Sequence, residues 1–138
     1  MLKLLKNFDF DVNEKQFLLG IHEKTAISIF DNKSHLRLDI RMADKKLDFE
    51  VLENAIQVKI FDYNLCMAPL EYVLLGKILY IGKIDDIPDS ELFEYQDILD
   101  FLTIYHANKE KIDEEFLIRK VKEIGLESTF KRLKSIKF

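Results

Sequence analysis

Residues 56–82 read IQVKIFDYNLCMAPLEYVLLGKILYIG, and the hydrophobic pattern changes inside this stretch. Before Pro69, the runs IQVKIFD and LCMA have the length of strands and flank the turn-forming residues Asp62-Tyr63-Asn64. From Pro69 onward the apolar residues recur at helical spacing, and proline fits the first turn of a helix. The stretch therefore predicts two strands, a boundary near residue 69, and a helix over 69–82.

A second pair of strands is predicted upstream, in residues 25–42, TAISIFDNKSHLRLDIRM. Ile27 and Ile29 alternate with Ala26, Ser28 and Phe30, which is typical of a strand with one deeply buried face. Residues 31–34 have turn-forming side chains, and in 35–42 the apolar and polar residues alternate strictly. This pattern predicts a β-hairpin. Short helices are predicted on either side of it, over 12–24 and 48–55.

The rest of the chain is predicted to be helical. Ser90 can cap a helix over 91–106, Asp113 can open a helix that runs to Ile124, and Gly125 suits its left-handed end. The predicted class is α+β: a small mixed, mostly antiparallel sheet over about 1–68, then a helical part over about 69–138. We expect one domain spanning 1–138.

The composition indicates a soluble protein with one core. The chain has 138 residues, is 48% hydrophobic and carries a formal net charge of −4. The negative charge argues against a protein that binds nucleic acid through charge alone, and the basic residues Lys131, Arg132, Lys134 and Lys137 are interpreted as a solvated helix end. Cys66 is expected to be a small core residue. No run of about 20 apolar residues and no signal sequence is present, so we expect a cytoplasmic protein without membrane contact.

Lys77 stands out because it shares a predicted helical stripe with Leu74, Ile78 and Ile81. One interpretation is that its aliphatic stem packs while its amine reaches water, or that Leu75 marks the true buried face. The other is that the ammonium meets a partner, because a cation removed from water needs one. Downstream, YQDILDFL places Asp97 in line with Phe101, so Asp97 is expected to be more buried than Asp100.

The ordered segments FDNKSHLRLDIRM, IQVKIFDYNLCMAPLEYVLLGKIL and YQDILDFL resemble the nucleotidyltransferase-fold proteins of the AbiEii toxin and minimal nucleotidyltransferase group, over roughly residues 20–135. The resemblance implies a nucleotidyltransferase-like fold and a possible toxin-antitoxin context. It implies that Asp39 is the third metal-site carboxylate and therefore catalytic. It further implies that Glu71, Lys77, Asp97 and Asp100 contribute to nucleotide binding, with Lys77 contacting a triphosphate or pairing with Asp97.

The implied reaction is transfer of a nucleotidyl group from a nucleoside triphosphate to a hydroxyl of protein or RNA, with two Mg²⁺ ions stabilising the attacking and leaving oxygens. The family's front end, a glycine-serine turn followed by two acids spaced as DxD, is expected to lie ahead of Met1. We therefore expect the chain to be inactive alone. It would need a separate polypeptide that carries this segment, or it would act as a non-catalytic binding and assembly module through homo- or hetero-oligomers.

Overall fold

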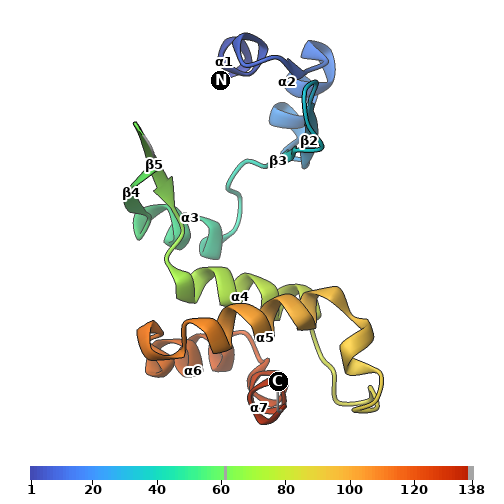
Figure 1. Cartoon of the computed structure of the whole chain (residues 1–138), viewed down its shortest axis with the longest axis vertical. Coiled ribbons are helices and arrows are strands. Elements are labelled where there is room, and N and C mark those ends of the chain that lie inside the picture. Colours follow the sequence, from blue (N-terminus) through green and yellow to red (C-terminus); the bar gives the residue numbers. More distant parts are fainter. Residues whose placement is uncertain (61, 137–138) are drawn as a thin grey trace. The chain divides into compact units, whose positions relative to one another are not determined.

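The structure is a computed structural model that describes residues 1–60 and 62–136, with only the backbone described at Ile60 and Tyr63. The chain divides into two compact units, residues 1–50 and 51–138. Helices and small antiparallel sheets are both present, and the helices gather in the C-terminal half (Figure 1). The predicted α+β class is confirmed.

The first unit is built on a three-stranded antiparallel sheet. Its strands are β1 (Phe10–Asp11), β2 (Ile27–Asp31) and β3 (Arg37–Ile40), in the order β1-β2-β3. The predicted hairpin is confirmed: Ile27 pairs with Ile40, and Phe30 pairs with Arg37. Asp31 holds the turn, because its carboxylate accepts hydrogen bonds from the Ser34 hydroxyl and the Lys33 amide.

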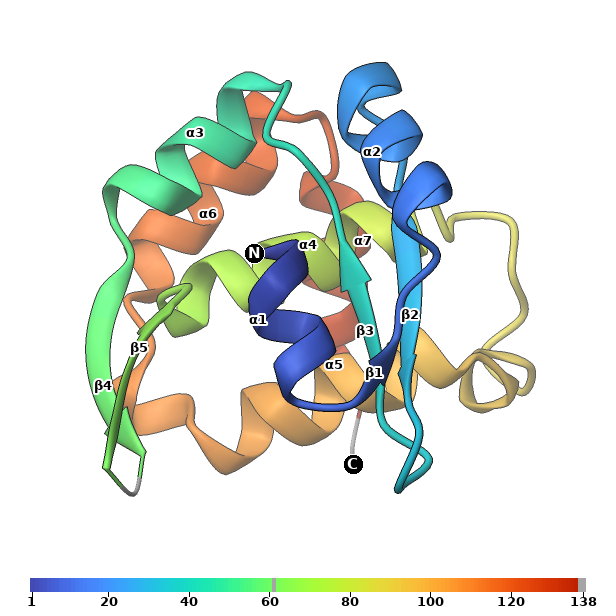
Figure 2. The same cartoon turned by 90° about the horizontal axis from the view of Figure 1, so that it is seen from above.

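One face of this sheet packs against two helices. These are α1 (Leu2–Asn7), which the sequence did not predict, and α2 (Glu14–Glu23), which it did (Figure 2). Asn13 caps α2 by accepting a hydrogen bond from the Gln16 amide at 3.1 Å. The small core of the unit consists of Leu5, Phe17 and Ile29, surrounded by Leu2, Phe10, Val12, Ile21, Ile27, Leu38 and Ile40. The opposite face of the sheet takes no part in this core, and polar side chains can therefore occupy it.

Helix α3 (Lys46–Glu53) contains the boundary between the two units and leads into a second hairpin, β4 (Ile56–Ile60) and β5 (Tyr63–Met67). Both strands were predicted, but the turn is shorter than expected because Tyr63 and Asn64 belong to β5. Phe61, which we placed in the first strand, lies outside the described residues. Cys66 is exposed, so its prediction as a core residue is wrong. It pairs with Gln57 on the polar face of the hairpin.

Helix α4 (Leu70–Ile81) begins immediately after Pro69, as predicted. The predicted helix over 91–106 is different: a short 3₁₀ turn, η1 (Leu92–Glu94), precedes α5 (Gln96–Ala107). Tyr95 separates them with an extended backbone, φ −92° and ψ 114°, which interrupts the helical hydrogen bonds. Ser90 is therefore not the cap of the long helix. Helices α4 and α5 pack side by side in the second unit (Figure 1).

The last two helices complete this unit after a short 3₁₀ turn, η2 (Lys109–Lys111). Asp113 caps α6 (Glu114–Glu123) by accepting a hydrogen bond from the Phe116 amide at 2.9 Å, and Gly125 follows with φ +72°, as predicted. Helix α7 (Glu127–Ser135) ends the described chain. The core of the unit is large, with side chains below 2% exposure at Leu74, Leu75, Ile78, Phe101, Leu102, Leu117, Val121, Phe130 and Leu133.

The basic residues of α7 are paired rather than free. Lys131 contacts Glu127, Arg132 contacts Asp89, and Lys134 contacts Glu114. Lys137 lies outside the described residues. No helix in the described part of the chain is both long enough and apolar enough to cross a lipid bilayer.

Candidate functional site

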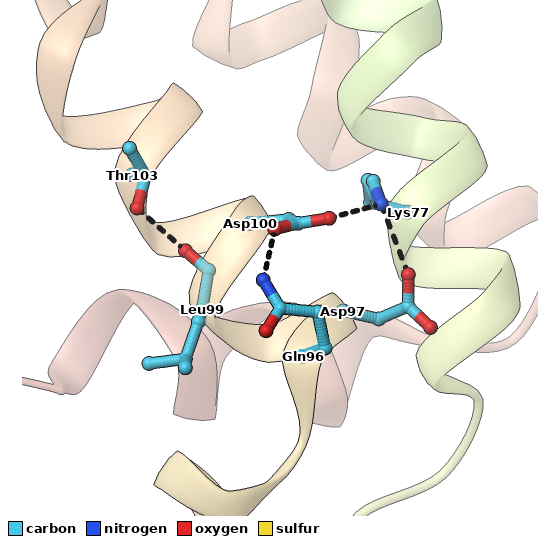
Figure 3. Close-up of polar contacts among 6 residues, drawn as sticks. All are labelled: Lys77, Gln96, Asp97, Leu99, Asp100 and Thr103. Atoms are coloured by element: carbon cyan, nitrogen blue, oxygen red, sulfur yellow. Dashed lines mark hydrogen bonds and ion pairs between the residues drawn. The ribbon is translucent and has the colours of Figure 1, made fainter. Parts of the chain in front are cut away.

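Lys77 is held by two carboxylates from the neighbouring helix. Its Nζ donates to Asp97 Oδ1 at 3.0 Å and to Asp100 Oδ2 at 2.6 Å (Figure 3). Asp100 Oδ1 in turn accepts a hydrogen bond from Gln96 Nε2 at 2.7 Å. The pairing of Lys77 with Asp97, one of the two roles implied by the resemblance, is therefore present. The lysine bridges α4 and α5.

The helical repeat explains how two acids reach one ammonium. Asp97 and Asp100 are three residues apart, so they project from the same side of α5 toward α4. The alignment of Asp97 with Phe101 predicted that Asp97 is more buried than Asp100, and this prediction is wrong. Its side chain is 47% exposed and that of Asp100 is 36% exposed. Contact with Lys77, rather than the apolar stripe, decides where both carboxylates lie.

The contacts in the cluster stabilise the charged forms of Lys77 and Asp100. Hydrogen bonds from Lys77 and then Gln96 lower the pKa of Asp100 below its ordinary value. The hydrogen bonds to Asp100 and Asp97 raise the pKa of Lys77, and they outweigh the opposing effect of partial burial. Lys77 and Asp100 are therefore both charged at neutral pH. A lysine ammonium has three donors, and these two contacts leave the third for another acceptor.

Glu71 lies apart from this cluster. Its Oε1 accepts a hydrogen bond from the Asp113 backbone amide at 2.9 Å, at the start of α6. The side chain therefore joins the first turn of α4 to the N-terminus of α6, where a carboxylate is favoured by the unpaired amides. This contact gives Glu71 a structural role.

Asp39 belongs to the first unit. On β3, its Oδ1 accepts a hydrogen bond from Ser28 Oγ at 2.5 Å, and its Oδ2 lies 2.9 Å from Arg37 Nη2. The Ser28 hydrogen bond and the Arg37 charge lower the pKa of Asp39 despite some desolvation. Asp39 is therefore a stable carboxylate with both oxygens engaged.

Two further acids in this unit were missed at the level of sequence. Asp9-Phe10-Asp11 has the DxD spacing that we expected only ahead of Met1, so that expectation is wrong on this point. No glycine-serine pair precedes these residues in the sequence. The signal was the alternation of apolar and acidic residues in 8–12, which also predicts a short strand. The strand itself, β1, is only two residues long, which makes such an alternation a weak signal.

The register of the sheet places Asp11 and Asp39 on one face. Asp11 lies opposite Phe30, and Ser28 lies opposite Asp39. Directly opposed residues share a face, and so do residues two apart on one strand. Asp11, Phe30, Ser28 and Asp39 therefore lie on the face turned away from the core of Leu5, Phe17 and Ile29. Asp9, just before β1, has φ +64°.

The donor chemistry of these acids suits magnesium, but their present arrangement does not. Carboxylate oxygens are the ligands that Mg²⁺ prefers. However, the Asp9 carboxylate pairs with Lys33 at 3.1 Å, and Asp39 pairs with Arg37. Within residues 1–60 and 62–136, no group of three or more histidine, cysteine, aspartate or glutamate side chains is arranged to hold a metal ion.

Comparisons with known proteins returned no match: no family model, no curated protein sequence and no solved structure is significantly similar to the chain.

Proposed function

We propose that this chain is a nucleotidyltransferase-like protein related to the AbiEii and minimal nucleotidyltransferase group. The observation that carries the proposal is that Asp11, in the DxD pair, and Asp39 occupy one face of one small sheet. Nucleotidyl transfer needs carboxylates that converge on metal ions, and strands of one sheet are a rigid way to bring them together. On this proposal, the acids that the reaction requires are residues of this chain.

The Lys77 cluster supports the same proposal. A positioned ammonium can donate a hydrogen bond to a triphosphate, and the aspartates on α5, which already balance its charge, fix its direction while leaving one donor available. Asp97 and Asp100 act here as positioning residues, because they touch the lysine. The substrate class is a nucleoside triphosphate, and the acceptor is a hydroxyl of protein or RNA.

Asp9 and Asp39 are each paired with a cation in this structure. The proposal therefore requires that Lys33 and Arg37 release these carboxylates when Mg²⁺ binds. Exposed ion pairs are weak, generally below about 1 kcal/mol, so a divalent cation can compete for such oxygens. A further polypeptide that supplies the glycine-serine turn remains part of the proposal.

Calorimetric titration with Mg²⁺ and ATP tests this function. We expect binding to the unaltered chain, and at least about tenfold weaker binding in Asp11→Asn, Asp39→Asn and Lys77→Ala, since each removes a charged contact worth about 1.5–3 kcal/mol. Asp86→Asn is the control, because Asp86 is exposed and has no hydrogen bond or ion pair among the described residues. Equal binding by all variants, or no binding by the unaltered chain, contradicts the proposal.

The alternative function is a non-catalytic assembly module. It is favoured by the β4–β5 hairpin, on which the opposed residues Ile56 and Met67 and the neighbouring Leu65 are 43–50% exposed. A two-stranded hairpin with an apolar face is marginal in water by itself, and self-association would cover it. Analytical ultracentrifugation tests this alternative. If the chain is a monomer at high concentration, and NMR shows that the β4–β5 hairpin is still formed, the assembly function is contradicted.

A further inference from the structure

A cavity of about 240 Å³ lies at the C-terminal end of α4, beside the start of α5. Its apolar wall includes Ile84, Ile87 and Ile98. Two tyrosines, Tyr80 and Tyr95, stand at the cavity with 84% and 47% of their surface exposed. Neither ring contacts another aromatic side chain of the described chain, and both rings are partly open to solvent beside the cavity.

Two oxygen acceptors also reach this cavity. Asp97 uses Oδ1 to bind Lys77, and its Oδ2 has no hydrogen bond to any described residue (Figure 3). Gln96 donates through Nε2 to Asp100, which leaves its carbonyl oxygen as an acceptor. The cavity therefore offers hydrogen-bond acceptors beside aromatic rings, and a ligand that fits it is rich in donors.

The segment that covers the cavity is held in place by α7. The Arg132 guanidinium donates to the carbonyl oxygens of Ile84 and Ile87 and binds Asp89 at 2.5 Å. Thr129, which is fully buried, donates to the Gly82 carbonyl at 2.9 Å. Residues 82–89 are thus anchored at several points, so the cavity is a preformed feature of the second unit.

The surroundings of the cavity are strongly acidic. Between Lys83 and Tyr95 the chain carries five exposed acids, Asp85, Asp86, Asp89, Glu91 and Glu94, and Lys83 is the one basic residue of that segment. Arg132 of α7 balances the charge of Asp89, so four of the five acids act on an approaching ligand. Such a field attracts cations and repels phosphate groups. The volume, below the roughly 300–1,000 Å³ of typical small-molecule pockets, also suits a single side chain better than a whole nucleotide.

We propose that this cavity binds an arginine side chain of a partner polypeptide, within a segment rich in basic residues. The guanidinium is planar, stacks on tyrosine and offers five donors, which matches the rings of Tyr80 and Tyr95 and the oxygens of Asp97 and Gln96. Lysine fits less well because its ammonium does not stack. The flanking basic residues of the partner face the exposed acids of 85–94. The inference does not rest on nucleotide binding, although Asp97 both lines the cavity and binds Lys77.

An NMR titration of the intact chain tests this inference. The probe is the blocked peptide Gly-Lys-Arg-Lys-Gly, compared with the same peptide carrying citrulline or lysine in place of arginine. We expect the arginine peptide to shift the signals of Tyr80, Tyr95 and Ile98. The citrulline peptide, which keeps the shape but loses the charge, is expected to bind about tenfold more weakly, and the lysine peptide about three- to fivefold more weakly.

Matched variants separate the cavity from general charge attraction. Tyr80→Ala is expected to weaken binding of the arginine peptide about three- to fivefold, which is the loss of one exposed cation–π contact. Phe93→Ala removes another exposed aromatic ring, 46% exposed, that does not line the cavity, and is expected to leave binding unchanged. Equal binding of the three peptides, equal effects of the two variants, or no shift at all overturns the inference. Displacement of the peptide by ATP from Tyr80 and Tyr95 overturns it as well, whereas ATP binding elsewhere leaves it intact.

Discussion

Lys77 and Asp100 are separated by 23 residues in the chain and joined by a 2.6 Å hydrogen bond between α4 and α5. The same ammonium also binds Asp97, so one side chain ties two positions within the first turns of a neighbouring helix to its own helix. Both helices contribute fully buried residues to the core, including Leu74, Ile78 and Phe101. Apolar packing therefore stabilises the contact between α4 and α5, and the polar cluster sets how the two helices are aligned with each other.

Replacing Lys77 by methionine is expected to destabilise the chain. The substitution keeps the aliphatic stem, removes two charge-assisted hydrogen bonds and leaves two acids facing each other. We expect a loss of about 1–2 kcal/mol, at the lower end for charged hydrogen bonds because the site is partly exposed. Urea unfolding followed by circular dichroism measures it. Lys83→Met is the control, since Lys83 is exposed and makes no ion pair with any described residue; an equal loss in both variants would mean that the cluster has no specific effect.

Acid is expected to weaken this contact. The pKa of Asp100 is lower in the folded chain than its ordinary value, so its contribution to stability is present above the unfolded pKa. The contribution is lost as pH falls below about 4. The difference in unfolding free energy between the unaltered chain and Asp100→Asn should thus be constant from pH 5 to 8 and shrink below pH 4. A difference that stays constant down to pH 2 would show that the charge of Asp100 is not involved.

Gly20→Ala is expected to destabilise the first unit. Gly20 is buried on α2, and an added Cβ would come within 2.4 Å of Ile27 Cγ1 and 2.8 Å of its Cδ1. Ile27 belongs to the core-facing side of β2, so the helix or the strand must shift. We expect a loss of about 1–3 kcal/mol, as for other overpacked cores. Thermal unfolding of the variant measures it, and an unchanged midpoint would show that the α2–β2 contact is loosely packed.

Gly76→Ala, in contrast, is expected to stabilise the chain. Gly76 lies inside α4, and an added Cβ would meet no atom within 4 Å. Alanine loses less backbone entropy than glycine on entering a helix, so we expect a gain of about 0.5–1 kcal/mol. The same thermal unfolding experiment applies. A destabilised variant would indicate that something else approaches this side of α4 in solution.

Arg132→Met is expected to release the segment 82–89. The substitution leaves the carbonyl of Ile84, a residue that is 1% exposed, without its charged donor. We expect a loss of about 1–3 kcal/mol and faster amide hydrogen exchange around residues 84–92. Lys131→Met is the matched control, because Lys131 is 73% exposed and its pair with Glu127 should contribute little. Unchanged exchange in Arg132→Met would mean that the segment is held by its apolar contacts alone.

The sequence by itself determined the local structure. The change of hydrophobic period near Pro69, the turn at 31–34, the cap at Asp113 and the glycine at 125 are all present, because each depends on a few neighbouring residues. The break at Tyr95 was not predictable in this way. No local residue pattern marks it, and the segment that precedes it is held by Arg132, which is more than 40 residues away in the chain.

Only the tertiary structure decided which polar side chains meet. Periodicity left the partner of Lys77 open, and the packing of α4 on α5 brought it to Asp97 and Asp100. Glu71, expected at the same site, is instead bound at the start of α6. The register of β1 and β3 on β2 placed Asp11 and Asp39 on one sheet face. The physical reason is that a hydrogen bond needs atoms within about 3 Å, and spacing along one helix or strand cannot say which distant element supplies the partner.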